Sequence, residues 1–325
     1  MFLRSSLCVI AAFCISACGG GGGSTSSKSA PSPTTTATPA PTPAPVINYA
    51  KAYNFDAEFN YPLVTASLER VGTYAGGEFI IQNEGRMLDV TTNSKFLSWD
   101  LAAETIHFDY GGDRFVFDRS DLEYDAGNGR IYRKQVLSPY RHEDLYIVEP
   151  NPNSKYLISA NQVLEYELTD GTGRNTEVER YVVGGSYTIP SDLPTSGIVK
   201  YKVIASSTTP TRDGAGGFTA TDASGTSTST EVTLDFASRS FRISIPFKQI
   251  SSTSGQPVRM TVTLVGAFDP STGKLEGTIE SPDSNYAGSF AGAFFGPKAS
   301  ELGIVFILKH PTDSSVVGTI IAFQP

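Results

Sequence analysis

The densest run of side chains that could do chemistry is Tyr140, Arg141 and His142, followed directly by Glu143 and Asp144. An imidazole beside carboxylates can ligate a metal ion, and the same mixture can bind a polar ligand. A solvated loop accounts for the run as well. We therefore take Tyr140, Arg141 and His142 as ligand-binding candidates and leave the loop interpretation open beside them.

A second polar series consists of Asp109, Asp113, Asp118 and Asp121. Carboxylates at short spacing can bind calcium, but a calcium loop also needs a glycine at a fixed position, and none stands there. We expect these residues to line the solvent face of a hairpin, and no metal ligand is predicted.

Catalytic motifs are missing from the sequence. It has no G-x-S-x-G, no H-E-x-x-H and no G-x-x-x-x-G-K, and the histidines His107, His142 and His310 share no ligand spacing. The glycine-rich run from Arg212 to Gly217 resembles a phosphate loop, but a hairpin turn is the simpler interpretation. We predict no catalytic residue, no enzyme activity and no cofactor of the protein's own, with iron or heme present only through a bound ligand.

Composition limits the fold and the partners. The 325 residues carry a net charge of -8 with a pI near 5.0, which argues against a nucleic-acid partner because such a protein needs a basic face. Only 18% of the residues are charged and no long stretch has helical spacing. The chain is therefore predicted to be all-β.

The first half of the folded chain reads as an antiparallel domain, with one short helix near Tyr61 to Arg70. Turns are predicted at Asn83 to Gly85, Asp125 to Gly129 and Asp170 to Gly173. They separate short strands at Glu78 to Gln82, Met87 to Thr91, Phe115 to Asp118, Ile131 to Gln135, Leu145 to Val148, Val163 to Leu168 and Glu179 to Val183.

The second half shows eight or nine strands, enough to close a barrel filled by side chains. In Ser240 to Phe247, apolar residues alternate with polar ones, so one face is dry and the other is wet. Pro246 suits a strand end or edge. Short strands with charged faces favour a soluble barrel over a membrane-spanning one, whose strands run to about 9 to 11 residues. The predicted strands are Ile198 to Ala205, one near Phe218, Thr230 to Phe236, Ser240 to Phe247, Val258 to Phe268, Lys274 to Ile279, two within Tyr286 to Lys309, and Val316 to Phe323.

The amino terminus predicts export and a membrane anchor. Arg4, an apolar run and Ile15-Ser16-Ala17-Cys18 form a secretory signal that is too short to span a membrane. The residues before Cys18 resemble the lipobox of bacterial lipoproteins, in which that cysteine becomes the lipid-bearing amino terminus. An ordinary signal with a chance cysteine is the alternative. Residues 19–45 are rich in Gly, Pro and Thr and predict a tether.

The run YAGSFAGAFFGPKASELGIVFILK, from Tyr286 to Lys309, predicts two strands around a Gly296-Pro297 turn. Its pattern G-x-F-x-G-x-F-F-G-P-x-A-x-E-x-G resembles the barrel signature of the transferrin-binding protein B family, and residues 181–201 resemble the start of that barrel. Gly303-Ile304 departs from the Gly pair found in many members. The predicted signal peptide covers 1–17 and the lipidated Cys18 with its tether 18–45. After them, the resemblance implies a handle-like β domain at 46–190 and an eight-stranded up-and-down barrel at 191–325.

The resemblance also implies a function. It suggests a non-enzymatic lipoprotein, anchored in the outer membrane of a Gram-negative bacterium and displayed at the cell surface. Such a protein captures a host protein or an iron or heme source beside a TonB-dependent receptor, and a lipoprotein-export barrel would deliver it there. A structural or assembly lipoprotein of the cell envelope, with no external ligand, is the alternative. No ligand-contact residue can be carried over from the family.

Overall fold

The computed structural model describes residues 48–75, 78–89, 95–137, 140–150, 152, 154–208, 219–220, 231–250, 257–281, 286–309 and 315–325. The predicted signal, Cys18 and tether lie outside these residues, as do Arg212 to Gly217, Phe218 and His310. From residue 47 onward the chain forms one compact unit. None of the described residues forms a helix long and apolar enough to cross a membrane.

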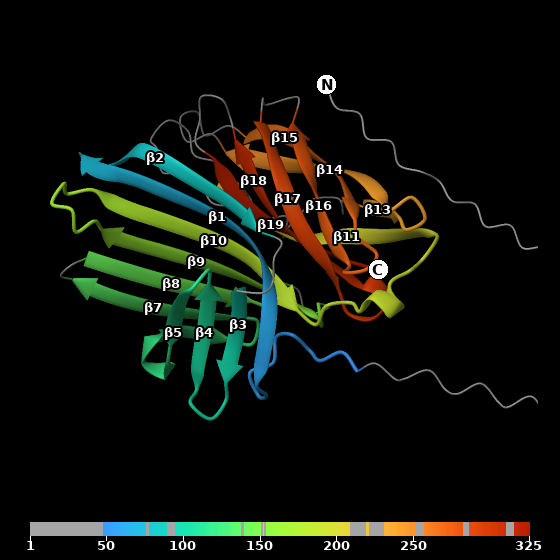
Figure 1. Ribbon diagram of the computed structural model, residues 1–325, viewed down its shortest axis with the longest axis horizontal. Coiled ribbons are helices and arrows are strands. Elements are labelled where there is room, and N and C mark those ends of the chain that lie inside the picture. Colours follow the sequence, from blue (N-terminus) through green and yellow to red (C-terminus); the bar gives the residue numbers. More distant parts are fainter. Residues whose placement is uncertain are drawn as a thin grey trace, which may run out of the picture. The chain divides into compact units, whose positions relative to one another are not determined.

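Two antiparallel sheets make up the unit, which confirms the all-β prediction (Figure 1). The first, here called the handle sheet, has the strand order β5-β4-β3-β1-β10-β9-β8-β7-β6, and β2 pairs with β1. Its strands are β1 (Phe59–Ala75), β2 (Glu78–Asp89), β3 (Lys95–Asp100), β4 (Thr105–Tyr110), β5 (Asp113–Phe117), β6 (Leu122–Ala126), β7 (Gly129–Leu137), β8 (Tyr140–Val148), β9 (Leu157–Glu167) and β10 (Asn175–Gly185), with the short 3-10 helix η1 (Arg119–Asp121) before β6.

The helix predicted near Tyr61 to Arg70 is wrong, because this segment lies inside β1, a strand of 17 residues. Side chains on both faces of the strand are buried: Leu63 faces the core of the handle sheet, whereas Val64 and Ala66 belong to a cluster shared with the second sheet. A strand covered on both faces shows no apolar-polar alternation, so its sequence cannot be told from a buried helix.

The turn predicted at Asn83 to Gly85 is also wrong, since these residues lie within β2. The pairing of β2 with β1 shifts between Val71 and Gly72, where one extra residue of β2 forms a bulge. The extra residue is Gln82, whereas Gly85 pairs regularly with Glu69. The turns predicted at Asp125 to Gly129 and at Asp170 to Gly173 are confirmed as the β6–β7 and β9–β10 connections.

The second sheet is the barrel: eight strands follow the predicted up-and-down order, and a ninth, the two-residue β12, pairs with β14. The sheet order is β12-β14-β15-β16-β17-β18-β19-β11-β13, and within the described residues no ladder joins β13 to β14, so the barrel is nearly closed. Pro246 lies in β14 at this seam, as an edge position requires. The strands are β11 (Ile198–Thr208), β12 (Thr219–Ala220), β13 (Glu231–Asp235), β14 (Ser240–Ile250), β15 (Pro257–Phe268), β16 (Lys274–Ser281), β17 (Tyr286–Phe295), β18 (Glu301–Lys309) and β19 (Val316–Phe323), with 3-10 helices η2 (Pro190–Asp192) and η3 (Pro297–Ala299).

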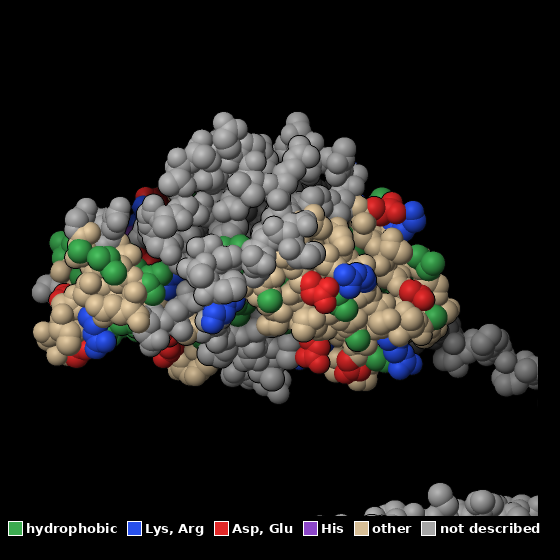
Figure 2. Space-filling view, turned by 90° about the horizontal axis from the view of Figure 1, so that it is seen from above, with side chains coloured by type: hydrophobic (Ala, Val, Ile, Leu, Met, Phe, Trp, Pro, Cys, Tyr) green, Lys and Arg blue, Asp and Glu red, His purple; other side chains and the backbone are tan. Residues whose placement is uncertain are grey.

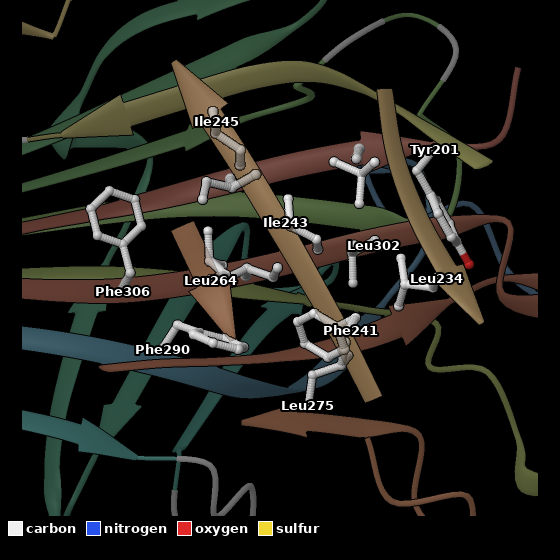
Figure 3. Close-up of a cluster of buried hydrophobic side chains, with 14 of the residues drawn as sticks. Tyr201, Leu234, Phe241, Ile243, Ile245, Leu264, Leu275, Phe290, Leu302 and Phe306 are labelled. Carbon is white, nitrogen blue, oxygen red and sulfur yellow. The ribbon is translucent and has the colours of Figure 1, made fainter. Parts of the chain in front are cut away.

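Large apolar side chains fill the barrel, as the alternation predicts (Figure 3). Phe241, Ile243 and Ile245 point inward from β14 and are at most 6% exposed. Phe290 shows how aromatics and glycines fit together, because a methyl group placed on Gly277 of the neighbouring strand would lie 2.8 Å from its ring. The ring occupies the space that a side chain at Gly277 would need, which allows the sheet to curve.

Candidate functional site

The predicted ligand-binding residues Tyr140, Arg141 and His142 all lie on β8 but do not form one site. Successive side chains of a strand point to opposite faces, so Arg141 is separated from the other two. Each also contacts a nearby carboxylate: Tyr140 Oη donates to Glu165 Oε2 at 3.3 Å, and Arg141 Nε donates to Glu143 Oε1 at 2.5 Å. This part of β8 is thus engaged in contacts within the strand and with β9.

His142 belongs to a network around Asp144, whose side chain is only 7% exposed. His142 Nε2 lies 3.0 Å from Asp144 Oδ2, Arg133 donates to both carboxylate oxygens at 2.8 and 3.2 Å, and the Tyr146 hydroxyl donates at 3.0 Å. Burial opposes ionisation of Asp144, but the hydrogen bonds from Arg133, His142 and Tyr146 hold its pKa below the ordinary value. The network stabilises an ionised carboxylate and joins β7 to β8.

Three members of the aspartate series, Asp109, Asp118 and Asp121, have structural partners. Asp109 accepts two bonds from Arg114, at 2.6 and 2.9 Å. Asp118 and Asp121 form a capping box around η1, in which each side chain accepts a backbone N–H bond. Within the described ranges, no three His, Cys, Asp or Glu residues come close enough to hold a metal ion.

The signature segment predicted from sequence forms β17, η3 and β18, and part of it faces the handle sheet. Glu301, at the start of β18, is 3% exposed. Its carboxylate accepts hydrogen bonds from Ser154 Oγ at 2.9 Å, from Lys155 N at 2.6 Å and from Tyr156 N at 3.2 Å. Burial raises the pKa of Glu301 above its ordinary value, more than these hydrogen bonds lower it. One barrel side chain thus holds the connection between β8 and β9.

Gly296 packs against the same connection. Its φ of 72° lies in the left-handed region, and a methyl group added there would lie 2.2 Å from Cδ2 of Tyr156. Gly303 makes a similar approach, since its methyl group would lie 2.6 Å from Leu157. The glycines of the signature therefore allow the two sheets to pack closely, in addition to shaping the barrel.

We call the contact between the barrel signature and the handle sheet the junction. Tyr49 and Asp192, which sequence reasoning missed, also belong to it. The Tyr49 hydroxyl donates to Asp192 Oδ2 at 2.9 Å, and the amide of Lys298 donates to the same oxygen at 2.9 Å. Further along the chain from Tyr49, Ala52 N donates to Lys155 O at 2.7 Å. Because these partners are 103 to 143 positions apart in sequence, no local motif could have revealed them.

Hydrophobic side chains are exposed at the ends of two hairpins of the handle sheet, β1–β2 and β7–β8, which β10 and β9 separate in the sheet order. Figure 2 shows hydrophobic side chains (green) beside charged ones at the left end of the view. Tyr74 and Ile80 are 46% and 51% exposed, and Val136 and Leu137 are 51% and 78% exposed. We call this group the hairpin-end patch. It consists of two exposed apolar pairs, one at each hairpin end.

Residues 193–324 match the family model described as the C-lobe and N-lobe beta barrels of Tf-binding protein B. Within the barrel, this match confirms the family resemblance that the signature predicts. No curated protein matches the chain.

Several solved structures are similar to this chain. Intact Ap-TbpB, with its N and C lobes, is 15% identical, with a TM-score of 0.45 over 81% of this chain and 46% of that one. A double mutant of Transferrin Binding Protein B from Haemophilus parasuis Hp5 is 14% identical, with a TM-score of 0.44 over 81% of this chain and 44% of that one. The isotype 1 protein from serogroup B Neisseria meningitidis is 10% identical, with a TM-score of 0.39 and the same two coverages. The chain therefore spans less than half the length of these proteins.

Proposed function

We propose that this protein is a non-enzymatic binding lipoprotein of the outer-membrane surface. The proposal rests on the match of residues 193–324 to the barrels of Tf-binding protein B. Lipid on Cys18 would anchor it, and residues 19–45 would hold the folded unit away from the membrane. The ligand would be a host protein, either one of transferrin type or another that carries iron or heme. The lipoprotein would pass this ligand to an outer-membrane receptor. The barrel match carries this proposal.

The hairpin-end patch is the surface proposed to bind the host protein. Burial of exposed apolar side chains favours protein association, and these four are exposed at hairpin ends. The barrel signature, in contrast, is engaged in packing and lies in the junction. Binding and scaffold thus occupy different parts of the chain.

Affinity capture from host serum tests the proposal. The unchanged protein should retain a serum protein, and Leu137→Glu combined with Val136→Glu should lose it because a charge in an apolar contact is costly. Ile198→Glu is the matched control, since Ile198 is also exposed, at 68%, but lies on the barrel. Equal capture by both variants would refute the patch, and no capture by the unchanged protein would count against the function.

Membrane anchoring and exposure need a second experiment. Cys18→Ala should move the protein from the membrane fraction to the soluble one. Protease added to intact cells should cleave the unchanged protein; full protection would instead indicate the periplasmic side and favour an assembly lipoprotein.

A further inference from the structure

The handle sheet curls, so that its two ends approach each other around an apolar core. Lys134 of β7 donates a hydrogen bond to the carbonyl of Val116 on β5, and its ammonium lies 5.5 Å from the ring centroid of Phe117. At one end of this curled sheet is a cavity of about 310 Å³. The mouths of curled sheets and barrels are common binding sites, and small-molecule pockets range from roughly 300 to 1,000 Å³.

Aromatic side chains line the inner part of this cavity. Phe55, Trp99 and Tyr132 contribute to its lining. The Trp99 indole is fixed by a hydrogen bond from Nε1 to the Phe55 carbonyl at 3.1 Å. The guanidinium of Arg130 lies 3.9 Å from the centroid of the Phe55 ring. The inner wall is therefore aromatic, with one guanidinium placed over the Phe55 ring.

The charged side chains of the lining are already paired. Arg130 lies 3.2 Å from Asp125, and Arg119 lies 3.0 Å from Glu104. Glu104 occupies the left-handed region with a φ of 51°, in the turn between β3 and β4. Each pair still has N–H groups and oxygen lone pairs that can form hydrogen bonds with a ligand. Because its charges cancel, the pair attracts a charged ligand only weakly.

Asp56 is the exception in the lining, because its carboxylate has no partner among the described residues. It lies in the segment before β1 and is exposed. A carboxylate can accept two hydrogen bonds from neighbouring hydroxyl groups. The cavity therefore combines an aromatic wall, hydrogen-bond donors and acceptors from the two ion pairs, and one unpaired carboxylate.

From this combination we propose that the cavity binds a neutral sugar residue. A pyranose ring presents C–H groups on its faces and hydroxyl groups at its rim, and each hydroxyl both donates and accepts. The C–H groups would meet the aromatic wall and the hydroxyls the paired ions and Asp56. This site lies apart from the hairpin-end patch and depends on neither the barrel match nor capture of a host protein.

The only tryptophan of the chain, Trp99, lines this cavity and also a second one, so its fluorescence reports on binding at either. Asp56 and Arg119 line only the cavity proposed here, so variants at these positions assign the response to it. The full-length protein, kept in a zwitterionic detergent, would be titrated with lactose, maltose and chitobiose, and with lysine amide and glutarate as charged probes. A neutral disaccharide should give a saturable change in Trp99 emission. Asp56→Ala and Arg119→Ala should each weaken it at least about tenfold, as expected on losing a hydrogen bond to a charged group.

Arg242→Ala is the matched control, because Arg242 also forms an exposed ion pair, with Glu280 at 3.2 Å, on the barrel. It should bind sugar like the unchanged protein. A desialylated glycoprotein, tested before and after enzymatic removal of its glycans, shows whether the site accepts a protein-linked sugar as well as a free one. A change in Trp99 emission with either source that is lost in Asp56→Ala supports the site. No response to either source, a response only to charged probes, or unchanged sugar binding by Asp56→Ala and Arg119→Ala would overturn it.

Discussion

Replacement of Glu301 by alanine should destabilise the fold more than most single substitutions. Three donors, the Ser154 hydroxyl and the amides of Lys155 and Tyr156, would lose their acceptor in a site where the glutamate is 3% exposed. Each buried group left unsatisfied costs about 1 to 3 kcal/mol. Allowing for entry of water, we expect a loss of roughly 3 to 5 kcal/mol in the free energy of unfolding.

Urea denaturation followed by circular dichroism would measure this loss. Glu301→Gln is the matched variant, since its amide oxygen can still accept from some of the donors and should recover part of the loss. The double variant with Ser154→Ala tests the contact itself, because the two single effects should not add if the side chains act together. A loss below about 1 kcal/mol for Glu301→Ala, or strict additivity, would refute the reasoning.

The same pair of proteins should differ in pH dependence. The folded-state pKa of Glu301 is raised, so its contribution to stability is fully present below the unfolded-state pKa and is lost as the pH rises through the folded-state pKa. Glu301→Gln has no such group. The stability of the unchanged protein relative to Glu301→Gln should therefore fall as the pH rises above the ordinary glutamate range, and a constant difference would contradict this.

Two further substitutions test the junction. In urea denaturation, Gly296→Ala should lower the free energy of unfolding more than Gly197→Ala does. Both positions have positive φ, but only the methyl group at 296 would collide, 2.2 Å from Tyr156. Equal losses of stability would show that the close approach does not matter. Tyr49→Phe removes the hydroxyl that donates to Asp192, should cost about 1 kcal/mol and should speed proteolysis of the segment before β1, whereas unchanged cleavage would contradict the contact.

Local periodicity was sufficient to predict most of the barrel. The alternation of Phe241, Ile243 and Ile245 with polar residues predicted the inward face of β14 correctly, because one face of that strand is buried and the other is wet. β1 was mistaken for a helix because both of its faces are covered. The turn at Asn83 to Gly85 was wrong for another reason, since a glycine beside polar residues is a common turn signal but Gly85 here pairs with Glu69 inside a strand.

The candidate site was less predictable than the fold. Tyr140, Arg141 and His142 are adjacent in sequence, yet the strand sends Arg141 to the opposite face. The junction and the aromatic cavity are built from residues brought together over long sequence distances, and Asp56 and Trp99 carry no motif. The signature did locate Gly296 and Glu301, although their contacts with the handle sheet depend on side chains outside it.

The attachment of Tyr49 and Ala52 has a mechanical consequence. A force applied along the chain from its amino-terminal side first reaches Tyr49, whose partner Asp192 also holds the Lys298 amide. It next reaches Ala52, bonded to Lys155 O, which is beside the amides that Glu301 binds. The load would thus be shared by several bonds in both sheets before β1 is strained, so strands would not be peeled off one hydrogen bond at a time.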